Sequence, residues 1–173
     1  MKPLFQKEVN SLIDEEMLDK VSALLKKQNL TVATAESCTG GLIAHTLTNI
    51  SGSSDYFDRG IVSYSNKAKM DLLDVPENLL KKYGAVSEQV AKAMAEGIRK
   101  TSNVDIGIAT TGMAGPTGGT EEKPVGLVYI AISTSEDTLV KKFHFSGERL
   151  QNKENTSKAA LELLFELLNK KNI

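Results

Sequence analysis

The chain has 173 residues, 40% of them hydrophobic and 25% charged, a composition typical of one compact globular domain. Its 21 lysines and arginines are balanced by 22 aspartates and glutamates, so it lacks the basic excess of proteins that neutralise nucleic-acid phosphates, and we expect no nucleic-acid partner. No stretch resembles a signal peptide or a membrane span, and the single cysteine, Cys38, cannot pair internally, so we expect a cytoplasmic protein without a membrane partner.

The first half of the chain alternates between helical apolar spacing and short β-rich runs. Residues 1–13 show no clear period and are expected to form a flexible arm ahead of one domain over 14–173. A sharp turn over 36–39 joins the first strand to a helix, so we expect Ser37 at the carboxyl end of that strand. The expected elements are a helix over 14–29, a strand over 31–35, a helix over 42–47, a strand over 60–64 and a helix over 66–73 that Ser65 caps.

The second half carries two more helices, a buried strand and a final pair of strands with a closing helix. Residues 111–124, rich in glycine and proline, are expected to form an ordered loop. The expected elements are a short helix between Pro76 and Gly84, a longer helix capped by Ser87, a central strand over 104–110, antiparallel strands over 126–133 and 139–145, and a helix over 155–168. Together these elements predict a single three-layer α/β/α domain with a mixed parallel and antiparallel sheet.

The two histidines limit the kinds of catalytic site that the chain can build. His45 falls on a predicted helix and His144 on a predicted strand, and neither stands in a pattern that supports a Ser-His-Asp site. Two histidines and one cysteine also supply too few nitrogen and sulfur ligands for a typical zinc site. A core or surface position is the simpler expectation for both histidines.

Ser37 is the candidate nucleophile. A serine at a strand-to-helix turn is exposed at the carboxyl edge of the sheet, beside the positive end of a helix and beside backbone N–H groups that could hold an oxyanion. Spacing alone favours a simpler interpretation, in which Ser37 or Thr39 only caps the helix. A serine nucleophile would also need a base.

Two lysines that follow the second strand are candidates for that base. A lysine can take the proton of a serine if desolvation or neighbouring positive charge lowers its pKa by ~3 units. Lys69 shares a helix face with the leucines that follow it, whereas Lys67 aligns with Asp71 on a wetter face, so Lys69 is the better candidate. Tyr64 could relay or hold the proton between Lys69 and the serine. Without other information, a solvated surface lysine remains the simpler interpretation.

The glycine-rich stretch over 112–119 could cradle a phosphate with its backbone N–H groups. It lacks the Gly-Lys-Ser/Thr of a P-loop and the spacing of a dinucleotide fingerprint. An ordinary long turn fits the pattern equally well.

Several short blocks of the sequence, taken in order, resemble the CinA carboxy-terminal domain family. The first is Ala35-Glu36-Ser37-Cys38-Thr39-Gly40-Gly41. The later blocks cover residues 52–54, 60–69, 84–87, 111–119 and 122–126. The resemblance extends from about residue 15 to the end of the chain.

This resemblance implies a metal-free and cofactor-free amidohydrolase that converts nicotinamide mononucleotide, a small nucleotide, to nicotinic acid mononucleotide and ammonia. By position, Ser37 would be the nucleophile, Lys69 the general base and Tyr64 its partner. Residues 112–119 would shape the nucleotide pocket, and family analogy implies a homo-oligomer. The implied substrate-binding residues are Glu36, Cys38, Thr39, Gly40, Ser54, Thr111, Gly112, Ala114, Gly115 and Arg149.

Two residues depart from the family pattern. Lys67 stands where an often acidic residue is expected, and Lys153 stands where a second arginine is expected, which predicts a weaker or monodentate phosphate contact. Many relatives carry an additional amino-terminal domain with a separate nucleotide-hydrolysing activity, which we expect this chain to lack. The alternative function is a non-catalytic module that senses a nucleotide or serves competence and DNA-damage processes. The Ser-Tyr-Lys set favours the enzyme.

Overall fold

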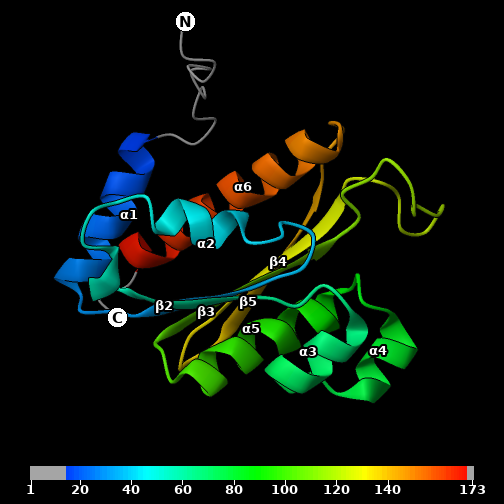
Figure 1. Cartoon of the computed structure of the whole chain (residues 1–173), viewed down its shortest axis with the longest axis horizontal. Helices are drawn as coiled ribbons and strands as arrows, with labels where there is room; N and C mark the ends of the chain where they lie inside the picture. The colour runs from blue at the N-terminus through cyan, green and yellow to red at the C-terminus, as the bar shows by residue number, and fades with distance from the viewer. Residues whose placement is uncertain (1–14, 171–173) are drawn as a thin grey trace, which may run out of the picture.

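The computed structural model describes residues 15–170, and the arm predicted over 1–13 lies outside them. One sheet lies between two layers of helices, which confirms the predicted three-layer α/β/α architecture (Figure 1). The helices on one face of the sheet are α1 (Glu15–Lys27), α2 (Leu42–Leu47) and α6 (Arg149–Lys170). Those on the other face are α3 (Asn66–Leu73), α4 (Glu77–Tyr83) and α5 (Glu88–Ser102). None of these described helices is long and apolar enough to cross a membrane.

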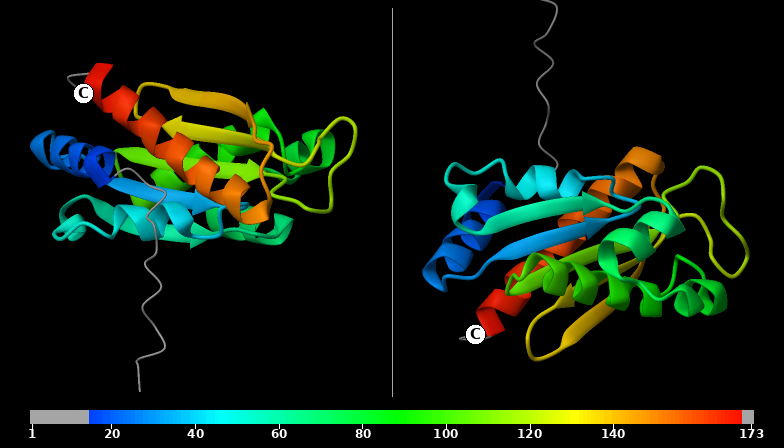
Figure 2. Two further views of the ribbon diagram at one scale, coloured as in Figure 1. Left: turned by 90° about the horizontal axis from the view of Figure 1, so that it is seen from above. Right: turned by 60° about the horizontal axis from the view of Figure 1, so that its bottom comes forward.

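The sheet has five strands in the order β2-β1-β3-β4-β5, seen from two sides in Figure 2. The strands are β1 (Val32–Glu36), β2 (Phe57–Val62), β3 (Ile106–Gly112), β4 (Leu127–Ser133) and β5 (Thr138–His144). β1 pairs in parallel with β2 and with β3, whereas β4 runs antiparallel to both β3 and β5. The mixed sheet is therefore as predicted, and β3 occupies its centre. Because β1, β2 and β3 are parallel, their carboxyl ends lie side by side at one end of the sheet, called here its carboxyl edge.

Each face of the sheet is covered by its own apolar core. α1 and α6 pack against one face, and α5 packs against the other through an apolar stripe of the predicted residues, Val90, Ala91, Met94, Ala95 and Ile98. Gly97 lets α3 approach α5 closely, because a Cβ there would lie 2.0 Å from the carbonyl oxygen of Leu73. This close contact sets the position of α3 beneath the carboxyl edge of the sheet.

Several element boundaries differ from the predicted ones, and three of these differences bear on the site. β2 begins at Phe57 rather than residue 60, because its exposed Asp58 and Arg59 hide the strand pattern at this sheet edge. β3 continues to Gly112, so the predicted loop begins two residues later than expected. α6 begins at Arg149 rather than residue 155, because its first turns bury polar residues instead of the apolar ones on which periodicity depends.

Candidate active site

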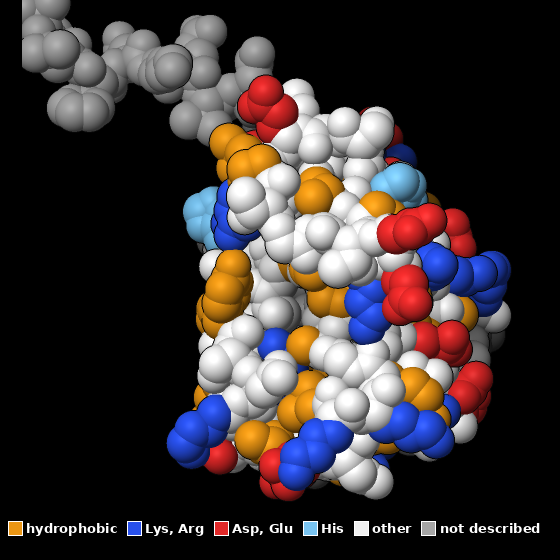
Figure 3. Space-filling view, turned by 90° about the vertical axis from the view of Figure 1, so that its right-hand side faces the viewer, with side chains coloured by type: hydrophobic (Ala, Val, Ile, Leu, Met, Phe, Trp, Pro, Cys, Tyr) orange, Lys and Arg blue, Asp and Glu red, His pale blue; other side chains and the backbone are white. Residues whose placement is uncertain are grey.

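A cavity of about 340 Å³ opens at the carboxyl edge of β1, β2 and β3. Figure 3 looks onto this end of the molecule, where acidic and basic side chains are interspersed around a hollow. The predicted site residues that line the cavity are Ser37, Cys38, Tyr64, Lys69, Thr111, Gly112, Ala114, Gly115 and Arg149. Met113 and Thr117 also line it and belong to the 112–119 stretch that was expected to shape the pocket, whereas the sequence interpretation missed Ala85 and Val86. Ala85 and Val86 lie between α4 and α5, a segment without any polar pattern that could have identified it.

Ser37 and Lys69 meet inside this cavity. Ser37 directly follows β1, and its backbone N–H donates to the carbonyl of Thr110 at 3.0 Å, which fixes its place beside β3. Lys69 comes from α3, which begins after Ser65; the Ser65 hydroxyl accepts from the N–H of Ala68, as the predicted cap requires. The amine of Lys69 lies 3.1 Å from the Oγ of Ser37.

The surroundings of the Lys69 amine match those of a neutral base. Its side chain is 1% exposed, and Nζ lies 2.8 Å from the carbonyl oxygen of Ser63 and 3.3 Å from that of Tyr64. A neutral amine has two N–H donors and one lone pair, so it can serve both carbonyls and still accept a hydrogen bond from the Ser37 hydroxyl. Burial lowers the pKa of Lys69, because an ammonium loses its hydration there.

Lys67 occupies the opposite, solvated side of α3. Its side chain is 78% exposed and pairs with Asp71 one turn away. Leu73 is fully buried on the Lys69 side, but Leu72 is half-exposed, so only one of the two leucines covers the amine as expected. The structure therefore brings Lys69, and not Lys67, to the serine.

Tyr64 contacts Lys69 in a different way from the one expected. Its hydroxyl accepts a hydrogen bond from Nη2 of Arg149 at 2.9 Å and does not lie between Lys69 and Ser37. Only the backbone carbonyl of Tyr64 reaches the amine. The predicted relay through the tyrosine hydroxyl is therefore absent from this arrangement of the described residues.

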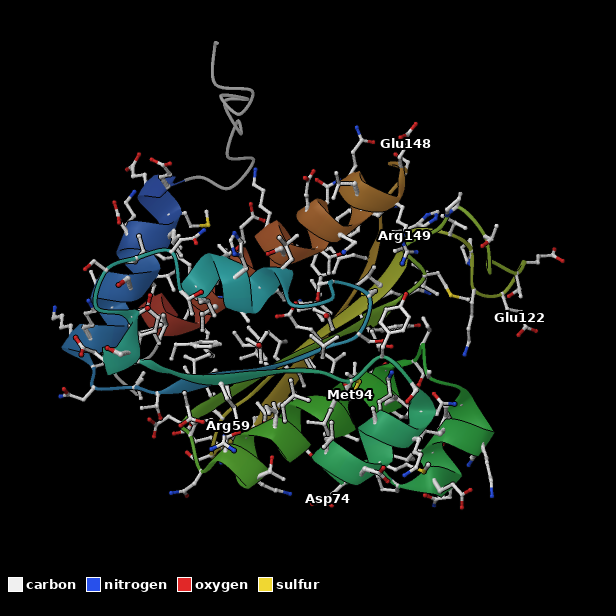
Figure 4. The ribbon with its side chains drawn as sticks, in the orientation of Figure 1. Arg59, Asp74, Met94, Glu122, Glu148 and Arg149 are labelled. Atoms are coloured by element: carbon white, nitrogen blue, oxygen red, sulfur yellow. The ribbon has the colours of Figure 1, made fainter. Side chains whose placement is uncertain are left out.

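Arg149, the first residue of α6, spans the mouth of the cavity (Figure 4). Its Nη1 donates to the carbonyl of Gly115 at 2.6 Å, while Nη2 donates to Tyr64. One guanidinium thereby links the loop after β3 to the segment after β2. Glu122 lies at the outer end of the loop after β3, well away from Arg149 (Figure 4).

Glu36 holds the amino-terminal end of α2 rather than lining the cavity. Its buried carboxylate accepts from the backbone N–H groups of Gly41, Ile43 and Ala44 at 2.8–3.1 Å, and from the hydroxyl of Thr34. The sequence analysis considered Ser37 or Thr39 as the cap, as the alternative to a nucleophilic Ser37, and the family resemblance placed Glu36 among the substrate-binding residues. Since Glu36 takes these helix N–H groups, they cannot also hold an oxyanion as expected.

Replacing Glu36 with glutamine should destabilise the fold by about 2–4 kcal/mol, because the amide NH₂ would face backbone donors where a carboxylate oxygen now accepts them. The change in the free energy of unfolding can be measured by urea denaturation. The exposed Glu77, replaced by glutamine in the same way, is the control and should cost well under 1 kcal/mol. Equal stability of Glu36→Gln and the wild-type protein would contradict the capping role.

Thr39 and Gly40, two other predicted site residues of this turn, are not part of the cavity lining. The hydroxyls of Thr39 and Thr110 lie 2.8 Å apart, and Thr39 is fully buried. Gly40 and Gly41 both have positive φ, which allows the chain to reverse from β1 into α2. Lys153 of α6 lies over Gly40, because a Cβ at Gly40 would be 3.5 Å from its amine. Lys153 is thus at the α6 side of the turn and does not line the cavity.

Ser54 lies at the opposite edge of the sheet from Ser37. It belongs to the short 3-10 helix Ser53–Asp55, which precedes β2, whereas the cavity follows the carboxyl ends of the parallel strands. The expectation that Ser54 lines the site is therefore not met in this structure.

The loop after β3 is held in place by several side chains, as expected of an ordered loop. Asn152 donates to the carbonyl of Ala114 at 3.1 Å, and Lys123 donates to the carbonyl of Tyr83 at 2.6 Å. On the strand side, the Thr111 hydroxyl donates to the carbonyl of Ala85 at 2.8 Å. These contacts fix the outer wall of the cavity.

Cys38 is the rival nucleophile in the same turn. It lines the cavity, yet only 6% of the residue is exposed. Burial raises the pKa of its thiol to about 11, which a hydrogen bond with Thr110 opposes only in part. The thiol is therefore protonated near neutral pH and is a weak nucleophile.

Native protein should react with iodoacetamide at pH 8 at least about 100-fold more slowly than free cysteine, because so little of Cys38 is thiolate. Mass spectrometry of the alkylated protein over time measures this rate, and unfolding in urea should restore ordinary reactivity. Labelling of native Cys38 as fast as free cysteine would contradict the buried, protonated thiol.

The remaining predicted chemistry-bearing residues lie elsewhere. His45 is in α2, and the His144 ring on β5 lies 3.1 Å from the carbonyl oxygen of Val125; neither lines the cavity. Within residues 15–170, no group of three or more His, Cys, Asp or Glu is arranged to hold a metal ion. The polar side chains in the cavity lining are those of Ser37, Cys38, Tyr64, Lys69, Thr111, Thr117 and Arg149.

Comparison with known proteins gives consistent matches along almost the whole chain. The model of the CinA C-terminal domain family matches residues 14–168. A CinA-like protein of Syntrophus aciditrophicus is 52% identical over 160 residues, which are 92% of this chain and 38% of that protein. A CinA-like protein of Geotalea daltonii is 53% identical over 152 residues, 87% of this chain and 37% of that protein. The chain thus spans well under half the length of these curated relatives.

Two solved structures share the fold. The competence/damage inducible protein CihA from Agrobacterium tumefaciens is 41% identical with a TM-score of 0.86, over 97% of this chain and 99% of that chain. A CinA superfamily protein from Klebsiella pneumoniae is 31% identical with a TM-score of 0.87, over 90% of this chain and 98% of that chain.

Proposed function

The chain belongs to the CinA C-terminal domain family, and we propose that it is a serine amidase that hydrolyses the carboxamide of nicotinamide mononucleotide. The observation that carries the proposal is the buried Lys69 amine, 3.1 Å from the Oγ of Ser37 in a cavity at the sheet edge. A serine hydroxyl beside a desolvated amine is the arrangement that Ser-Lys acyl transfer needs. The choice of substrate rests on the family resemblance.

In the acylation step, Lys69 takes the Ser37 proton while Oγ forms a bond to the carboxamide carbon, and the carbonyl oxygen becomes an oxyanion. Collapse of this intermediate restores the C=O bond and breaks the C–N bond. The proton on Lys69 goes to the departing nitrogen, which leaves as ammonia. Ser37 then carries the nicotinoyl group of the nucleotide as an ester, with the ribose phosphate still attached to the pyridine ring, and Lys69 is neutral again.

Deacylation repeats the sequence with water. Lys69 takes a proton from water as the hydroxide attacks the ester carbon, and collapse releases Ser37 Oγ, which recovers the proton from Lys69. The product is nicotinic acid mononucleotide, so one water is consumed and one ammonia released for each turnover.

Oxyanion stabilisation falls to the turn after Ser37. Because Glu36 takes the N–H groups of Gly41, Ile43 and Ala44, the helix end itself is unavailable. Among the described residues, no backbone carbonyl outside the regular helices and strands accepts a hydrogen bond from the N–H groups over 38–40. They are the donors from which an oxyanion hole could be built.

Arg149 supports an anionic substrate. It is the charged side chain of the cavity lining that is neither the nucleophile nor the base, and among residues 15–170 its guanidinium bonds to a carbonyl and a tyrosine hydroxyl. A guanidinium held by neutral partners remains able to bind a phosphate. We assign it to the phosphate of the mononucleotide.

Ammonia release from nicotinamide mononucleotide by the purified protein tests the proposal. We expect turnover with formation of nicotinic acid mononucleotide. A coupled assay measures the ammonia released, and chromatography identifies the product. Folded protein that binds the nucleotide without releasing ammonia would support a non-catalytic sensing module instead.

A further inference from the structure

Ser63 carries a buried hydroxyl without a hydrogen-bond partner. Within the described residues, four buried side-chain atoms share this property: Gln28 Oε1 and the hydroxyl oxygens of Ser63, Ser102 and Ser157. An unpaired buried hydroxyl destabilises a fold, so each such group in a native structure calls for an explanation. Of the four, Ser63 is the one next to the Ser37–Lys69 pair.

The backbone of Ser63 is fixed between the two reactive residues. Its N–H donates to the carbonyl of Glu36 at 2.9 Å, and its own carbonyl accepts from the amine of Lys69 at 2.8 Å. Ile61, two residues before Ser63, and Ala35, two residues before Ser37, pack into the same apolar core. Ser37 and Ser63 directly follow β1 and β2, and the alternation of side chains along these strands, continued by one residue, assigns both serines to the side of the sheet that α3 covers.

Ser63 does not touch the substrate cavity. It is fully buried and does not belong to the cavity lining, whereas Lys69 does. A role for this hydroxyl in the reaction therefore has to be indirect, and the residue of the pair that Ser63 already contacts, through its carbonyl, is Lys69. Rotation about the Cα–Cβ bond gives this hydroxyl three staggered positions around a fixed backbone.

The charge state of Lys69 creates a need that such a hydroxyl can meet. The neutral amine donates to the carbonyls of Ser63 and Tyr64 and accepts from Ser37, so all its hydrogen-bonding positions are used. Once Lys69 holds the Ser37 proton, it has three donors, and Ser37 Oγ is bonded to the substrate carbon. The third N–H then lacks a good acceptor until the proton passes to the leaving nitrogen.

We infer that Ser63 is a positioning residue whose hydroxyl accepts a hydrogen bond from the ammonium form of Lys69 and releases it when the amine becomes neutral. The inference rests on the proposed Ser37–Lys69 chemistry. Ser63 keeps its own proton throughout, so the proton path still runs from Ser37 to Lys69 to the departing ammonia. The Ser63 hydroxyl, unpaired in the resting enzyme, thus becomes a hydrogen-bond acceptor only when Lys69 is protonated.

Other charged or titratable groups also lie around the amine, and of these Cys38 raises the pKa of Lys69, against the larger effect of burial. Cys38, Tyr64 and Arg149 line the same cavity, and the Glu36 carboxylate is held by the N–H groups of α2. On α3 itself, Lys67 and Asp71 pair with each other in solvent. α5 packs against α3 through the backbone of Gly97, which brings no charge.

The test compares Ser63→Ala with Ser157→Ala in the full chain. Ser157 is the matched control, since it is also fully buried and unpaired but lies in α6, away from Lys69. Three quantities are measured. NMR of ¹³Cε-labelled lysine gives the pKa of Lys69, steady-state kinetics gives the pH dependence of kcat/KM for nicotinamide mononucleotide, and urea denaturation gives the stability. Lysine NMR requires no turnover, so it tests the hydrogen bond even if the amidase proposal fails.

Ser63→Ala should lower the pKa of Lys69, because the ammonium loses an acceptor. The acid limb of the rate profile should move to lower pH by the same amount, and the maximal rate should fall about tenfold, as expected for one hydrogen bond to a charged group. Stability should hold or rise, because an unpaired hydroxyl is removed. Ser157→Ala should match the stability gain without altering the pKa or the rate.

The separate variant Ser63→Thr keeps a hydroxyl at this position, so the pKa of Lys69 in it should equal the wild-type value. An unchanged or raised Lys69 pKa in Ser63→Ala, or the same shift in Ser157→Ala, would overturn the inference. If nicotinamide mononucleotide is not hydrolysed but the Lys69 pKa falls in Ser63→Ala alone, the amidase proposal fails while the hydrogen bond stands.

Discussion

Replacing Ser37 with alanine should lower the rate of ammonia release from nicotinamide mononucleotide by about a thousandfold or more. Alanine has no oxygen to form the acyl-enzyme, whereas the serine hydroxyl contributes little to the affinity for the ground state. Nucleotide affinity, measured by calorimetry, should therefore stay within a few-fold of the wild-type value. The structure leaves room for this change, since the small side chain lies at the cavity wall.

Cys38→Ser is the control for that variant. It changes the neighbouring side chain in the same turn, and because the Cys38 thiol is buried and protonated, activity should remain within about tenfold of the wild type. If Ser37→Ala kept activity within a few-fold while Cys38→Ser lost it, the nucleophile would be the cysteine.

Lys69→Arg should be nearly inactive as well, with a loss of about a thousandfold, although the positive charge is kept. A guanidinium does not release its proton at working pH, so it cannot serve as the base. The wild-type rate should fall on acidification through an apparent pKa below the ordinary lysine value of about 10.4, because burial lowers the pKa of Lys69 and only the neutral amine is active. Steady-state kinetics over a pH series measures both effects.

Lys67→Arg is the matched control on the same helix. Lys67 is exposed and pairs with Asp71, and arginine can keep that pair, so activity and stability should stay close to normal. An inactive Lys67→Arg beside an active Lys69→Arg would contradict the assignment of the base.

Much of the fold could be predicted because it follows from local patterns. The caps at Ser65 and Ser87 appear in the structure with the expected hydrogen bonds, to the N–H groups of Ala68 and Val90. The period of α3 ranked Lys69 above Lys67 as the better base, and the structure buries Lys69 and exposes Lys67, although spacing alone still favoured a solvated lysine. A serine after a β-rich run also predicted correctly that Ser37 lies at the sheet edge.

Other features depend on contacts between distant segments, which spacing does not encode. The Tyr64 hydroxyl turns to Arg149, 85 residues away in sequence, and no local pattern indicates that partner. Ser54 was misplaced although a signal existed: a residue that precedes a parallel strand lies at the opposite edge from one that follows it. Glu36 also had a signal, because an acidic residue close to the start of a helix is a natural partner for its free N–H groups.

Mass spectrometry of enzyme quenched during turnover tests most directly whether Ser37 is acylated by its amide substrate. Wild-type protein mixed with nicotinamide mononucleotide and stopped in acid within the first turnovers should yield a peptide with the acyl group on Ser37. Ser37→Ala should yield none, and Lys69→Arg should accumulate far less than the wild type. Turnover without any acylated Ser37, or with the acyl group on Cys38, would contradict the account.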